Sequence, residues 1–381
     1  MKNPADVFKS KKGMKFMAVR FLIVIFAFIS VHIYVLRHVW QQIPIPVWGK
    51  WGVVLLAVCA LILFFFVVTS RHIDSLPMPV SSAIYKMGTS WFFVMLYLLM
   101  LYLVLDLGRL CRLVPGGFLH DSWWGAATVA AIIVVTFAWG NIHYHHKVRR
   151  PLTLTTTKSL PKPLRIVMMS DLHLGYGIQR PEFQRWIDMI KDEKPDLVLI
   201  AGDIIDRNIR PLEEQRMWEE FQRLNVPVVA CLGNHDYYAG QSGAQEFYKK
   251  AGIHLLRDEA LQIDGVTVVG RDDRLNMRRK SVKTLMDGVD RQQYVILLDH
   301  QPYHLEEAEK AGVDFQLSGH THYGQVWPVS WITDAIYEVA FGAYQKGATR
   351  YYVSSGMGIW GGKFRIGTCS EYVVADLVSE K

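Results

Sequence analysis

Four long apolar stretches occupy most of the first 150 residues, and they limit what this part of the chain can fold into. They cover about 17–36, 51–69, 90–108 and 123–142. Each approaches the roughly 20 residues that a helix needs to cross a bilayer core. Buried helices of a soluble core are the alternative. Because the four stretches are consecutive and Val53–Ser70 and Trp123–Ile142 carry no charge, we predict a four-helix transmembrane region.

The residues flanking these stretches also fit a membrane. Arg20 and Asp106 lie near segment ends, where polar side chains can reach the interface. Seven tryptophans lie towards the segment ends, as in an aromatic belt: Trp40, Trp48, Trp51, Trp91, Trp123, Trp124 and Trp139. The first stretch follows a lysine-rich start. It is longer than the apolar core of a signal peptide, about 7–15 residues, and lacks a small-x-small cleavage site, so we expect a retained anchor.

Charge divides the chain in the same place. Residues 1–150 carry 15 Lys and Arg but 4 Asp and Glu, whereas the remainder carries 27 and 31. The basic excess therefore belongs to the apolar half, where it sets topology, and no nucleic-acid partner is expected. Four spans put both ends on one side. The N-terminal lysines and Lys147, Arg149 and Arg150 favour the cytoplasm, while Arg109 and Arg112 oppose it. We predict a multi-pass protein of the cell (inner) membrane with a cytoplasmic C-terminal half.

The chain beyond residue 150 begins with a short connecting segment. Residues 151–163 contain three prolines and a threonine run, which indicates a linker or a leading strand. The predicted domains are a four-span region at 1–150, this linker at 151–163, and a globular domain at 164–381. Cysteine spacing fits neither a disulfide framework nor a zinc site; the four cysteines are Cys59, Cys111, Cys231 and Cys369.

The globular domain alternates apolar strand patterns with helical ones. Strands at 164–170, 196–201 and 226–232 alternate with helices at 181–191, 212–224 and 243–251, which predicts an α/β core. A β-rich section follows, with strands at 261–264, 266–270, 294–298, 315–318, 350–354 and 371–377 and a helix at 304–311. The expected fold is a layered α/β sandwich of two sheets.

This domain contains five short polar segments, most of them directly after a predicted strand. Each is common alone, but their ordered recurrence is specific. Because ligand sites form beyond the carboxyl ends of strands, we expect these segments to meet at one edge. They contain Asp171 and His173; Gly202, Asp203 and Asp206; Gly233, Asn234, His235 and Asp236; Asp299 and His300; and Gly319, His320 and His322.

These side chains supply the ligands of a two-metal site. Asp171 and His173 are two residues apart, so on an extended segment they would point to the same side. Asp203 has two carboxylate oxygens and could bridge two ions. Asn234 offers a carbonyl oxygen, and the three later histidines offer imidazoles. With no thiolate, this set suits two divalent ions, first Mn and otherwise Fe or Zn. Two ions about 3.5–4 Å apart activate water and clamp the attacking and leaving oxygens, which predicts hydrolysis of a phosphate ester or anhydride.

The series D-x-H, G-D-x-x-D, G-N-H-D, H and G-H-x-H, over about 164–377, resembles the calcineurin-like metallophosphoesterase superfamily. The membrane-anchored layout is similar to its branch of YkuE- and YaeI-like proteins and transmembrane proteins with a metallophosphoesterase domain. That branch often reads G-H-T-H-G-G-Q, whereas this chain has Tyr323 at the fifth position. The bulkier side chain could narrow the pocket, which affects the substrate more than metal binding.

The resemblance implies a role for each residue. The first ion would take Asp171, His173, Asp203 and His322, and the second Asp203, Asn234, His300 and His320. The catalytic residues would be His235 and Asp236: His235 would contact the phosphate or protonate the leaving oxygen, and Asp236 would orient His235 or a ligand. Asp206 would hold the loop or a ligand. A purely structural role stays open for both Asp206 and Asp236.

Two features suggest a lipid-linked phosphate substrate. The domain is tied to a bilayer, and residues 326–344 are apolar and aromatic, which fits either a helix at the membrane interface or a buried helix. Relatives with this layout resemble enzymes that cleave UDP-2,3-diacylglucosamine or phospholipid-type diesters. We therefore predict a membrane-surface phosphodiesterase or pyrophosphatase. Arg365 and Lys363 could neutralise substrate phosphate or could be solvated surface residues.

Two other functions stay open. One is a tethered phosphoesterase for a soluble nucleotide or phosphoprotein. The other is a non-enzymatic membrane scaffold or sensor, whose usual sign, a lost ligand, is missing from the five motifs. The sequence does not indicate an oligomeric state.

Overall fold

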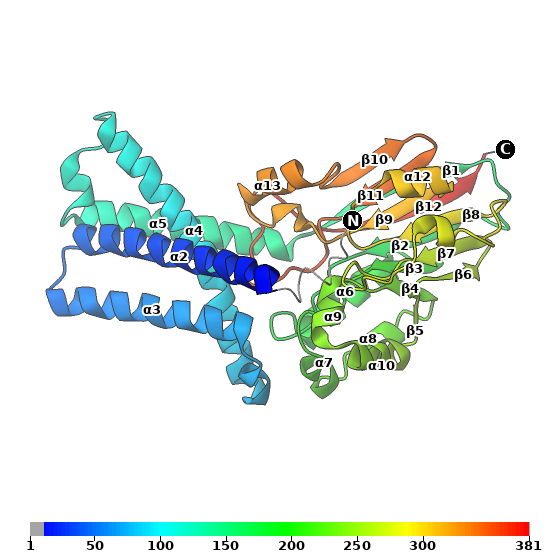
Figure 1. The fold of residues 1–381 in the computed structure, drawn as a ribbon, viewed down its shortest axis with the longest axis horizontal. Helices are drawn as coiled ribbons and strands as arrows, with labels where there is room; N and C mark the ends of the chain where they lie inside the picture. Colours follow the sequence, from blue (N-terminus) through cyan, green and yellow to red (C-terminus); the bar gives the residue numbers. More distant parts are fainter. Residues whose placement is uncertain (1–10, 381) are drawn as a thin grey trace. The chain divides into compact units, whose positions relative to one another are not determined.

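A computed structural model describes residues 11–380, without the side chains of 11–22 and 24, and shows two compact units (Figure 1). The first comprises the chain up to Thr69 together with Met87–Phe137, and the second comprises Ser70–Lys86 together with the chain from Ala138 onward. Two long helices, α4 (Met78–Leu110) and α5 (Trp123–His145), contribute residues to both units.

The first unit is helical. It contains α2 (Lys11–Gln42), α3 (Val47–Thr69) and most of α4 and α5; a short turn, η2 (Gly116–Leu119), precedes α5. Among the described residues, α3, α4 and α5 are long and apolar enough to cross a membrane, so three of the four predicted spans coincide with long apolar helices. The predicted span at 17–36 falls within α2, but part of it lies outside the described side chains.

Polar side chains pair inside the helical unit. The hydroxyl of Tyr34 donates to Asp106 Oδ2 at 2.7 Å, and His38 Nε2 lies 3.0 Å from the same oxygen. The hydroxyl of Tyr102 donates to Gln42 Oε1 at 2.8 Å. These contacts join α2 to α4. Asp106 therefore has partners within the bundle, as a carboxylate in a membrane segment requires.

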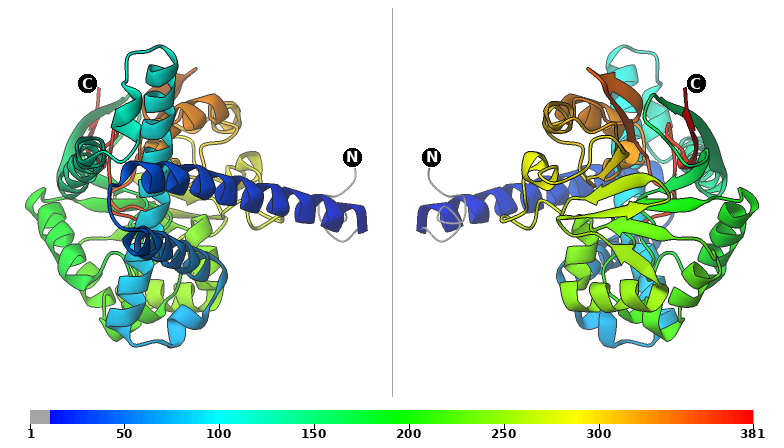
Figure 2. Two further views of the ribbon diagram at one scale, coloured as in Figure 1. Left: turned by 90° about the vertical axis from the view of Figure 1, so that its left-hand side faces the viewer. Right: turned by 90° about the vertical axis from the view of Figure 1, so that its right-hand side faces the viewer.

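The second unit contains two six-stranded sheets (Figure 2), which confirms the predicted two-sheet α/β sandwich. The first sheet has the order β1-β12-β2-β3-β4-β5, with β1 at Lys147–Thr156, β2 at Leu164–Met169, β3 at Leu197–Ala201, β4 at Val228–Cys231, β5 at Ile253–Leu255 and β12 at Ser370–Ser379. The second has the order β10-β11-β9-β8-β7-β6, with β6 at Glu259–Ile263, β7 at Val266–Gly270, β8 at Tyr294–Leu298, β9 at Phe315–Ser318, β10 at Gly342–Lys346 and β11 at Thr349–Val353.

The central strands are apolar throughout because both of their faces are buried. In β2, Ile166 and Met168 join the core between the sheets, while Val167 and Met169 join the core under the helices. Strands β2 to β5 run parallel to one another, as do β7, β8, β9 and β11. Their carboxyl ends therefore carry the loops that follow them to shared edges.

Helices cover the outer face of each sheet. On the first sheet lie α6 (Arg180–Asp192), α8 (Trp218–Gln222) and α10 (Gln241–Ala251), whose buried aromatic residues join the same core. Two short helices, α7 (Arg210–Glu214) and α9 (Asn234–Ala239), lie in the loops between them. On the second sheet lie α11 (Val282–Leu285) and α12 (Glu306–Ala311). The predicted helix at 212–224 is in fact divided between α7 and α8.

Two other segments differ from expectation. Much of the predicted linker belongs to β1, which pairs in parallel with β12 from Lys147 to Thr156, so the leading-strand alternative is correct there. The apolar segment 326–344 is helical only in α13 (Val329–Ile336), and its last residues enter β10. The turn η3 (His322–Gly324) precedes α13.

Candidate metal centre

The five motifs meet at one edge of the second unit. Asp171 follows β2, Asp203 follows β3, Asn234 follows β4, His300 follows β8 and His320 follows β9. Since these strands end at a common edge, the loops converge there. The structure brings together all seven residues predicted to bind metal, and every one is buried or nearly so: Asp171, His173, Asp203, Asn234, His300, His320 and His322.

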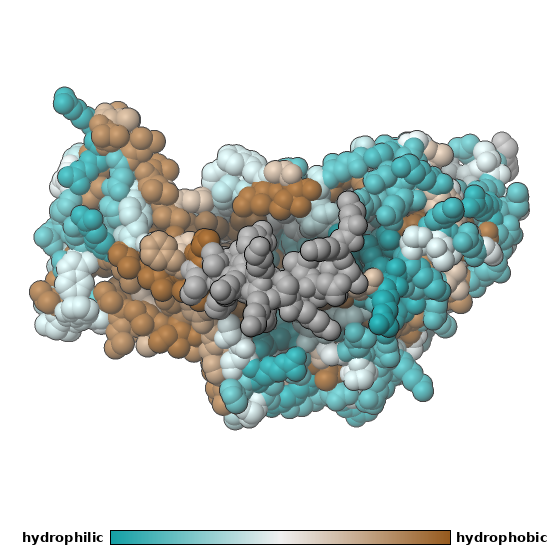
Figure 3. Space-filling model, in the orientation of Figure 1, coloured by the Kyte–Doolittle hydropathy of each residue, from teal (hydrophilic) through white to brown (hydrophobic). Residues whose placement is uncertain are grey.

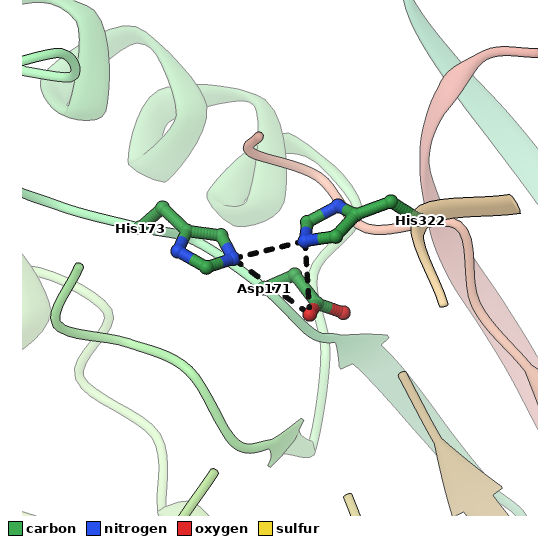
Figure 4. A group of neighbouring side chains, drawn as sticks. All are labelled: Asp171, His173 and His322. Carbon is green, nitrogen blue, oxygen red and sulfur yellow. Dashed lines mark hydrogen bonds and ion pairs between the residues drawn. The ribbon is translucent and has the colours of Figure 1, made fainter. Parts of the chain in front are cut away.

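The first group of ligand atoms comes from Asp171, His173 and His322. Figure 4 shows both imidazoles turned towards each other and towards the carboxylate. The Nε2 atoms of His173 and His322 are 3.0 Å apart. Asp171 Oδ1 lies 3.8 Å from the first and 3.5 Å from the second. One cation between these atoms could contact all three side chains.

The second group comes from Asp203, His300 and His320. His300 Nε2 lies 3.1 Å from Asp203 Oδ2 and 3.3 Å from Asn234 Oδ1. The same Asp203 Oδ2 lies 3.8 Å from His173 Nε2 of the first group. Asp203 therefore stands between the two groups, which is the position the sequence predicted for a bridging carboxylate.

The hydrogen bonds of the imidazoles show that this donor set fits a cation. His300 Nδ1 lies 2.7 Å from the carbonyl oxygen of Ala201, and His173 Nδ1 lies 3.2 Å from Asp206 Oδ1. An oxygen acceptor fixes the proton on each Nδ1, so each neutral ring turns its Nε2 lone pair towards carboxylate oxygens. Lone pairs that face lone pairs in a buried site are unfavourable, so the site favours a positive charge there, which a bound cation or a proton on Nε2 would supply.

The pKa values follow the same charge pattern. Burial lowers the pKa of His173, but Asp171 and Asp206 outweigh it and raise the pKa to about 10. Asp203 raises the pKa of His300 in the same way against its burial. Burial and then the charge of His300 lower the pKa of His320 to about 4. The carboxylates thus favour positive charge at the centre, whereas His320 is held neutral and keeps its lone pair.

The backbone at the site is unusual and differs from the predicted extended segment. Asp171 and His173 have φ values of 54° and 46°, in the left-handed region. Asp203, His320 and His322 share that region, at 54°, 70° and 47°. Such conformations cost about 1–3 kcal/mol each and cluster at functional sites. A left-handed turn, and not the alternation of a strand, brings Asp171 and His173 together.

Two glycines let backbone approach the carboxylates closely. A Cβ at Gly233 would lie 2.1 Å from Asp203 Oδ1, and a Cβ at Gly319 would lie 2.3 Å from Asp171 Oδ2. No other residue fits at these positions without moving a ligand. The close approach also lets backbone N–H groups bind the carboxylates: the N–H of His235 donates to Asp203 Oδ1 at 2.8 Å, and the N–H of His320 donates to Asp171 at 3.1 Å.

His235 lies beside the centre and is oriented by Asp206. Its Nδ1 lies 2.6 Å from the backbone oxygen of Asp206 and 3.3 Å from Asp206 Oδ1. The proton is therefore on Nδ1, and Nε2 is the nitrogen left for a substrate. The ring of His235 also contacts that of His173 edge to face, with centroids 4.5 Å apart.

The hydrogen bonds of Asp236 fit the second of its two expected roles, which is to orient a ligand, here Asp203. Its carboxylate is fully buried and accepts the backbone N–H groups of Asp203, Ile205 and Gly233 at 2.8–3.0 Å. It therefore fixes the loop that carries Asp203, while Asp206 contacts His235. Burial and the charge of Asp203 raise the pKa of Asp236 to about 6.

Neither environment predicted for Arg365 and Lys363 is present. Arg365 is fully buried, and its guanidinium donates to the carbonyl oxygens of His322, Ser355, Gly356 and Gly358. Lys363 is largely buried and pairs with Glu182. Arg365 thus holds together the loops that carry His322 and residues 355–358. Both cations bind protein oxygens and not substrate or solvent.

Sequence reasoning missed the loop after β11. Gly358 N–H donates to the carbonyl oxygen of Asp171 at 3.0 Å, and Met357 N–H donates to that of Ser170 at 3.1 Å. Gly356 has φ +90° and lies against Asp171. This loop therefore supports the left-handed turn at Asp171. The signal that could have found it is a Ser-Gly-rich segment directly after a predicted strand.

Tyr323 turns towards α13. Its ring stacks on Phe341 with centroids 5.1 Å apart, and its hydroxyl lies 3.4 Å from Asp334 Oδ2. The residue that departs from the family pattern thus contacts the apolar segment next to the centre.

Comparisons with known proteins bear on this site. The family model described as calcineurin-like phosphoesterase matches residues 164–324, which contain all five motifs. An uncharacterized metallophosphoesterase of Aquifex aeolicus is 34% identical over 233 residues, covering 58% of this chain and 88% of that protein. The metallophosphoesterase YkuE of Bacillus subtilis is 30% identical over 209 residues, covering 51% of this chain and 72% of that protein.

The name of a third relative describes it as a transmembrane protein. A transmembrane protein with metallophosphoesterase domain from Danio rerio is 30% identical over 225 residues. The match covers 55% of this chain and 52% of that protein, so this chain spans about half of that relative's length. These matches confirm the resemblance drawn from the five motifs.

Proposed function

Because the chain belongs to the calcineurin-like metallophosphoesterases, we propose that it is a membrane-anchored hydrolase of a lipid-linked phosphodiester or pyrophosphate. The observation that carries the hydrolase part is the donor set at the strand ends, in which Asp203 stands between two groups of ligands. Membrane anchoring rests on the three apolar helices.

Two divalent ions fit the two groups, Mn first and otherwise Fe or Zn. Asp171, His173, Asp203 and His322 would hold one, and Asp203, Asn234, His300 and His320 the other. When bound, such ions lower the pKa of water and neutralise charge on a phosphoryl oxygen. The chain's own residues hold the ligands in place: Asp236 and Gly233 fix Asp203, and Arg365 fixes the loop of His322.

His235 is the residue placed to act on the substrate. Its side chain is 18% exposed, and its Nδ1 is bound to Asp206, so Nε2 is available to a phosphate or a leaving oxygen. Because Nδ1–H donates to Asp206, donation to the leaving oxygen requires a second proton on Nε2. A histidine protonated on both nitrogens can give this Nε2 proton to the leaving oxygen as the ester bond breaks, and the ring then returns to its neutral Nδ1–H form.

The lipid part of the proposal is supported by α13, which directly follows the last motif. Trp331, Ile332 and Ile336 are 65%, 59% and 56% exposed, and Figure 3 shows apolar side chains gathered over this helix. The adjoining Tyr337 lies near His320, with ring centroids 6.2 Å apart. An apolar face beside the centre suits a substrate with acyl chains.

This face lies close to the end of a candidate span. The N–H of Trp327 donates to the carbonyl oxygen of Ile366 at 2.7 Å, and the N–H of Arg365 donates to that of Gly140 in α5 at 2.9 Å. Residues 365 and 366 are therefore hydrogen-bonded both to Trp327, which lies shortly before α13, and to Gly140 near the end of α5. Since α5 is long and apolar enough to cross a bilayer, we expect the face to lie at the membrane surface.

We predict that the double substitution Trp331→Ser and Ile332→Ser lowers turnover of a phosphate ester carried in vesicles by about tenfold, because less apolar surface enters the lipid. Turnover of a soluble ester such as bis-p-nitrophenyl phosphate should stay within about twofold. Both rates are measured on the full-length protein in vesicles of the same composition with Mn.

The matched control is Leu275→Ser with Met277→Ser, which removes two other exposed apolar side chains and should leave both rates unchanged. Equal loss on both substrates would contradict a lipid-facing role for α13. Turnover confined to soluble esters in the wild type would favour the tethered enzyme for a nucleotide or phosphoprotein.

We further propose that the second unit lies in the cytoplasm, from the parity of four spans and the basic residues around them. A fluorescent protein that folds only in the cytoplasm, fused after Lys381, should be bright. A phosphatase that folds only outside the cytoplasm, fused at the same place, should be inactive, and the reverse pair of results would place the unit on the other side.

A further inference from the structure

The loop after β7 begins at the same edge of the second sheet as two of the metal-binding motifs. Strands β7, β8 and β9 run parallel, so the residues that follow β7 start beside those that carry His300 and His320. The N–H of Arg271 donates to the carbonyl oxygen of Leu298 at 2.9 Å, just before the motif with His300. The loop at residues 271–281 therefore starts next to the centre, although it contains none of the five motifs.

The arginines of this loop have different partners. Arg271 and Arg279 are largely buried and both pair with Asp299, at 3.1 Å and 3.2 Å. Arg274 is half-buried, and within the described part of the chain it pairs with no carboxylate. Its guanidinium carbon instead lies 4.2 Å from the centre of the Tyr303 ring. The cation is thus held over an aromatic face and keeps its N–H donors for an anion.

Tyr303 connects this cation to the metal centre. Its ring packs against that of Tyr337 with centroids 4.8 Å apart, and the two hydroxyl oxygens are 3.1 Å apart. The Tyr337 ring in turn lies 6.2 Å from that of His320, a predicted metal ligand. Each hydroxyl carries one proton, and the bond between them uses one of the two. The other proton has no acceptor among the described residues, so one O–H can donate to a ligand oxygen.

We propose that Arg274 and the hydroxyls of Tyr303 and Tyr337 bind a second anionic group of the substrate, in addition to the phosphate that is cleaved. The proposal rests on the function proposed above and narrows it to substrates with two anionic groups, such as a lipid-linked pyrophosphate. A guanidinium with a nearby hydroxyl donor suits an anionic oxygen, because hydrogen bonds to charged acceptors are the stronger ones. None of the three residues is a predicted metal ligand, so this site would bind an anion that the metal centre does not hold.

The test compares esters that differ in their number of anionic groups. Bis-p-nitrophenyl phosphate carries one, and the symmetric bis-p-nitrophenyl pyrophosphate carries two with the same aryl groups. In the full-length protein with Mn, Arg274→Gln should lower kcat/KM for the pyrophosphate by about 10–100-fold, because it removes a charge-assisted hydrogen bond. With the diester, which has no second anion, the variant should stay within about twofold of wild type. Products are separated by chromatography and quantified.

Three further variants separate direct contact from other effects. Arg278→Gln removes an exposed positive charge of the same loop and should change neither rate by more than about twofold, because exposed charges act weakly at a distance. Arg274→Lys keeps the charge without the planar set of donors and should recover part of the loss. Tyr337→Phe should lower kcat/KM for the pyrophosphate by about 3–10-fold, the cost of one hydrogen bond.

A third ester identifies the second anion. A diaryl phosphate with a carboxylate on one ring places its second charge farther from the phosphorus than the pyrophosphate does. A selective loss in Arg274→Gln with either two-anion ester supports the proposal, and the ester with the larger loss shows whether a second phosphate or a more distant anion is bound. Equal losses on all three esters, or rates within twofold of wild type on all three, would overturn the proposal and leave the hydrolase standing.

Failure of the proposed function would look different. A wild type that turns over no phosphate compound would remove the hydrolase. Binding of diphenyl methylenebisphosphonate, which has two anionic groups and resists hydrolysis, would then decide the role of Arg274 by titration calorimetry with Mn. Binding weakened about tenfold in Arg274→Gln but unchanged in Arg278→Gln would support the site. Equal binding by wild type and Arg274→Gln would overturn it.

Discussion

Replacing Asp203 with alanine is expected to reduce metal-dependent phosphate hydrolysis by at least about 10³-fold, equivalent to about 4 kcal/mol of transition-state stabilisation. Asp203 Oδ2 lies 3.1 Å from His300 Nε2 and 3.8 Å from His173 Nε2, so one change removes a ligand from both groups. The expected loss exceeds the roughly 10–100-fold cost of losing a residue that only supports a ligand.

The measurement is kcat/KM for a soluble diester with added Mn, together with Mn affinity of the purified full-length protein. Asp376→Ala is the matched control, because this half-exposed carboxylate on β12 pairs only with Arg165 among the described residues, and such pairs near the surface contribute little. Asp203→Ala should lose both metal affinity and turnover, and Asp376→Ala neither. An Asp203→Ala protein with more than a tenth of wild-type turnover would contradict the bridging role.

The parts of the centre that the sequence predicted are those next to strand ends. Asp171, Asp203, Asn234, His300 and His320 each follow an apolar strand, and the carboxyl ends of neighbouring parallel strands lie at one edge. Their convergence therefore follows from local patterns. The left-handed backbone at Asp171 and His173 does not, because it depends on Gly358 from a loop almost 200 residues away.

The supporting residues were harder to predict because their partners are remote in the chain. Arg365 was expected either to neutralise substrate phosphate or to be solvated at the surface, but four carbonyl oxygens from two loops bind it. Asp206 and Asp236 lie in adjacent motifs and are both buried. Only the fold shows that the first contacts His235 and the second contacts backbone.

Tyr85 illustrates the limit more sharply. It lies between the predicted spans at 51–69 and 90–108, so the boundary at residue 150 assigns it to the membrane region, whereas the N–H of Gly361 donates to its hydroxyl oxygen at 3.1 Å. The separation into a membrane half and a catalytic half, drawn from composition, therefore divides the chain at a different place from the packing, which assigns Ser70–Lys86 to the unit that holds the metal centre.

The second large effect is expected for His235→Asn. The backbone N–H that binds Asp203 is kept, and the asparagine amide can still donate near the position of Nδ1 to the backbone oxygen of Asp206. Metal affinity should therefore stay close to that of the wild type. The variant loses Nε2, and with it the proton for the leaving oxygen, so kcat for an alkyl phosphodiester should fall by about 10²–10⁴-fold.

The size of the loss should depend on the leaving group. A p-nitrophenolate leaves without protonation, so His235→Asn should cost at most about tenfold with bis-p-nitrophenyl phosphate, far less than with an alkyl ester. A histidine that only contacted the phosphate would give equal losses with both esters, because the phosphate is common to them. Comparing kcat for the two esters in wild type and variant thus decides between the two roles that the resemblance leaves open for His235. A large loss of Mn affinity would contradict both and make it a ligand.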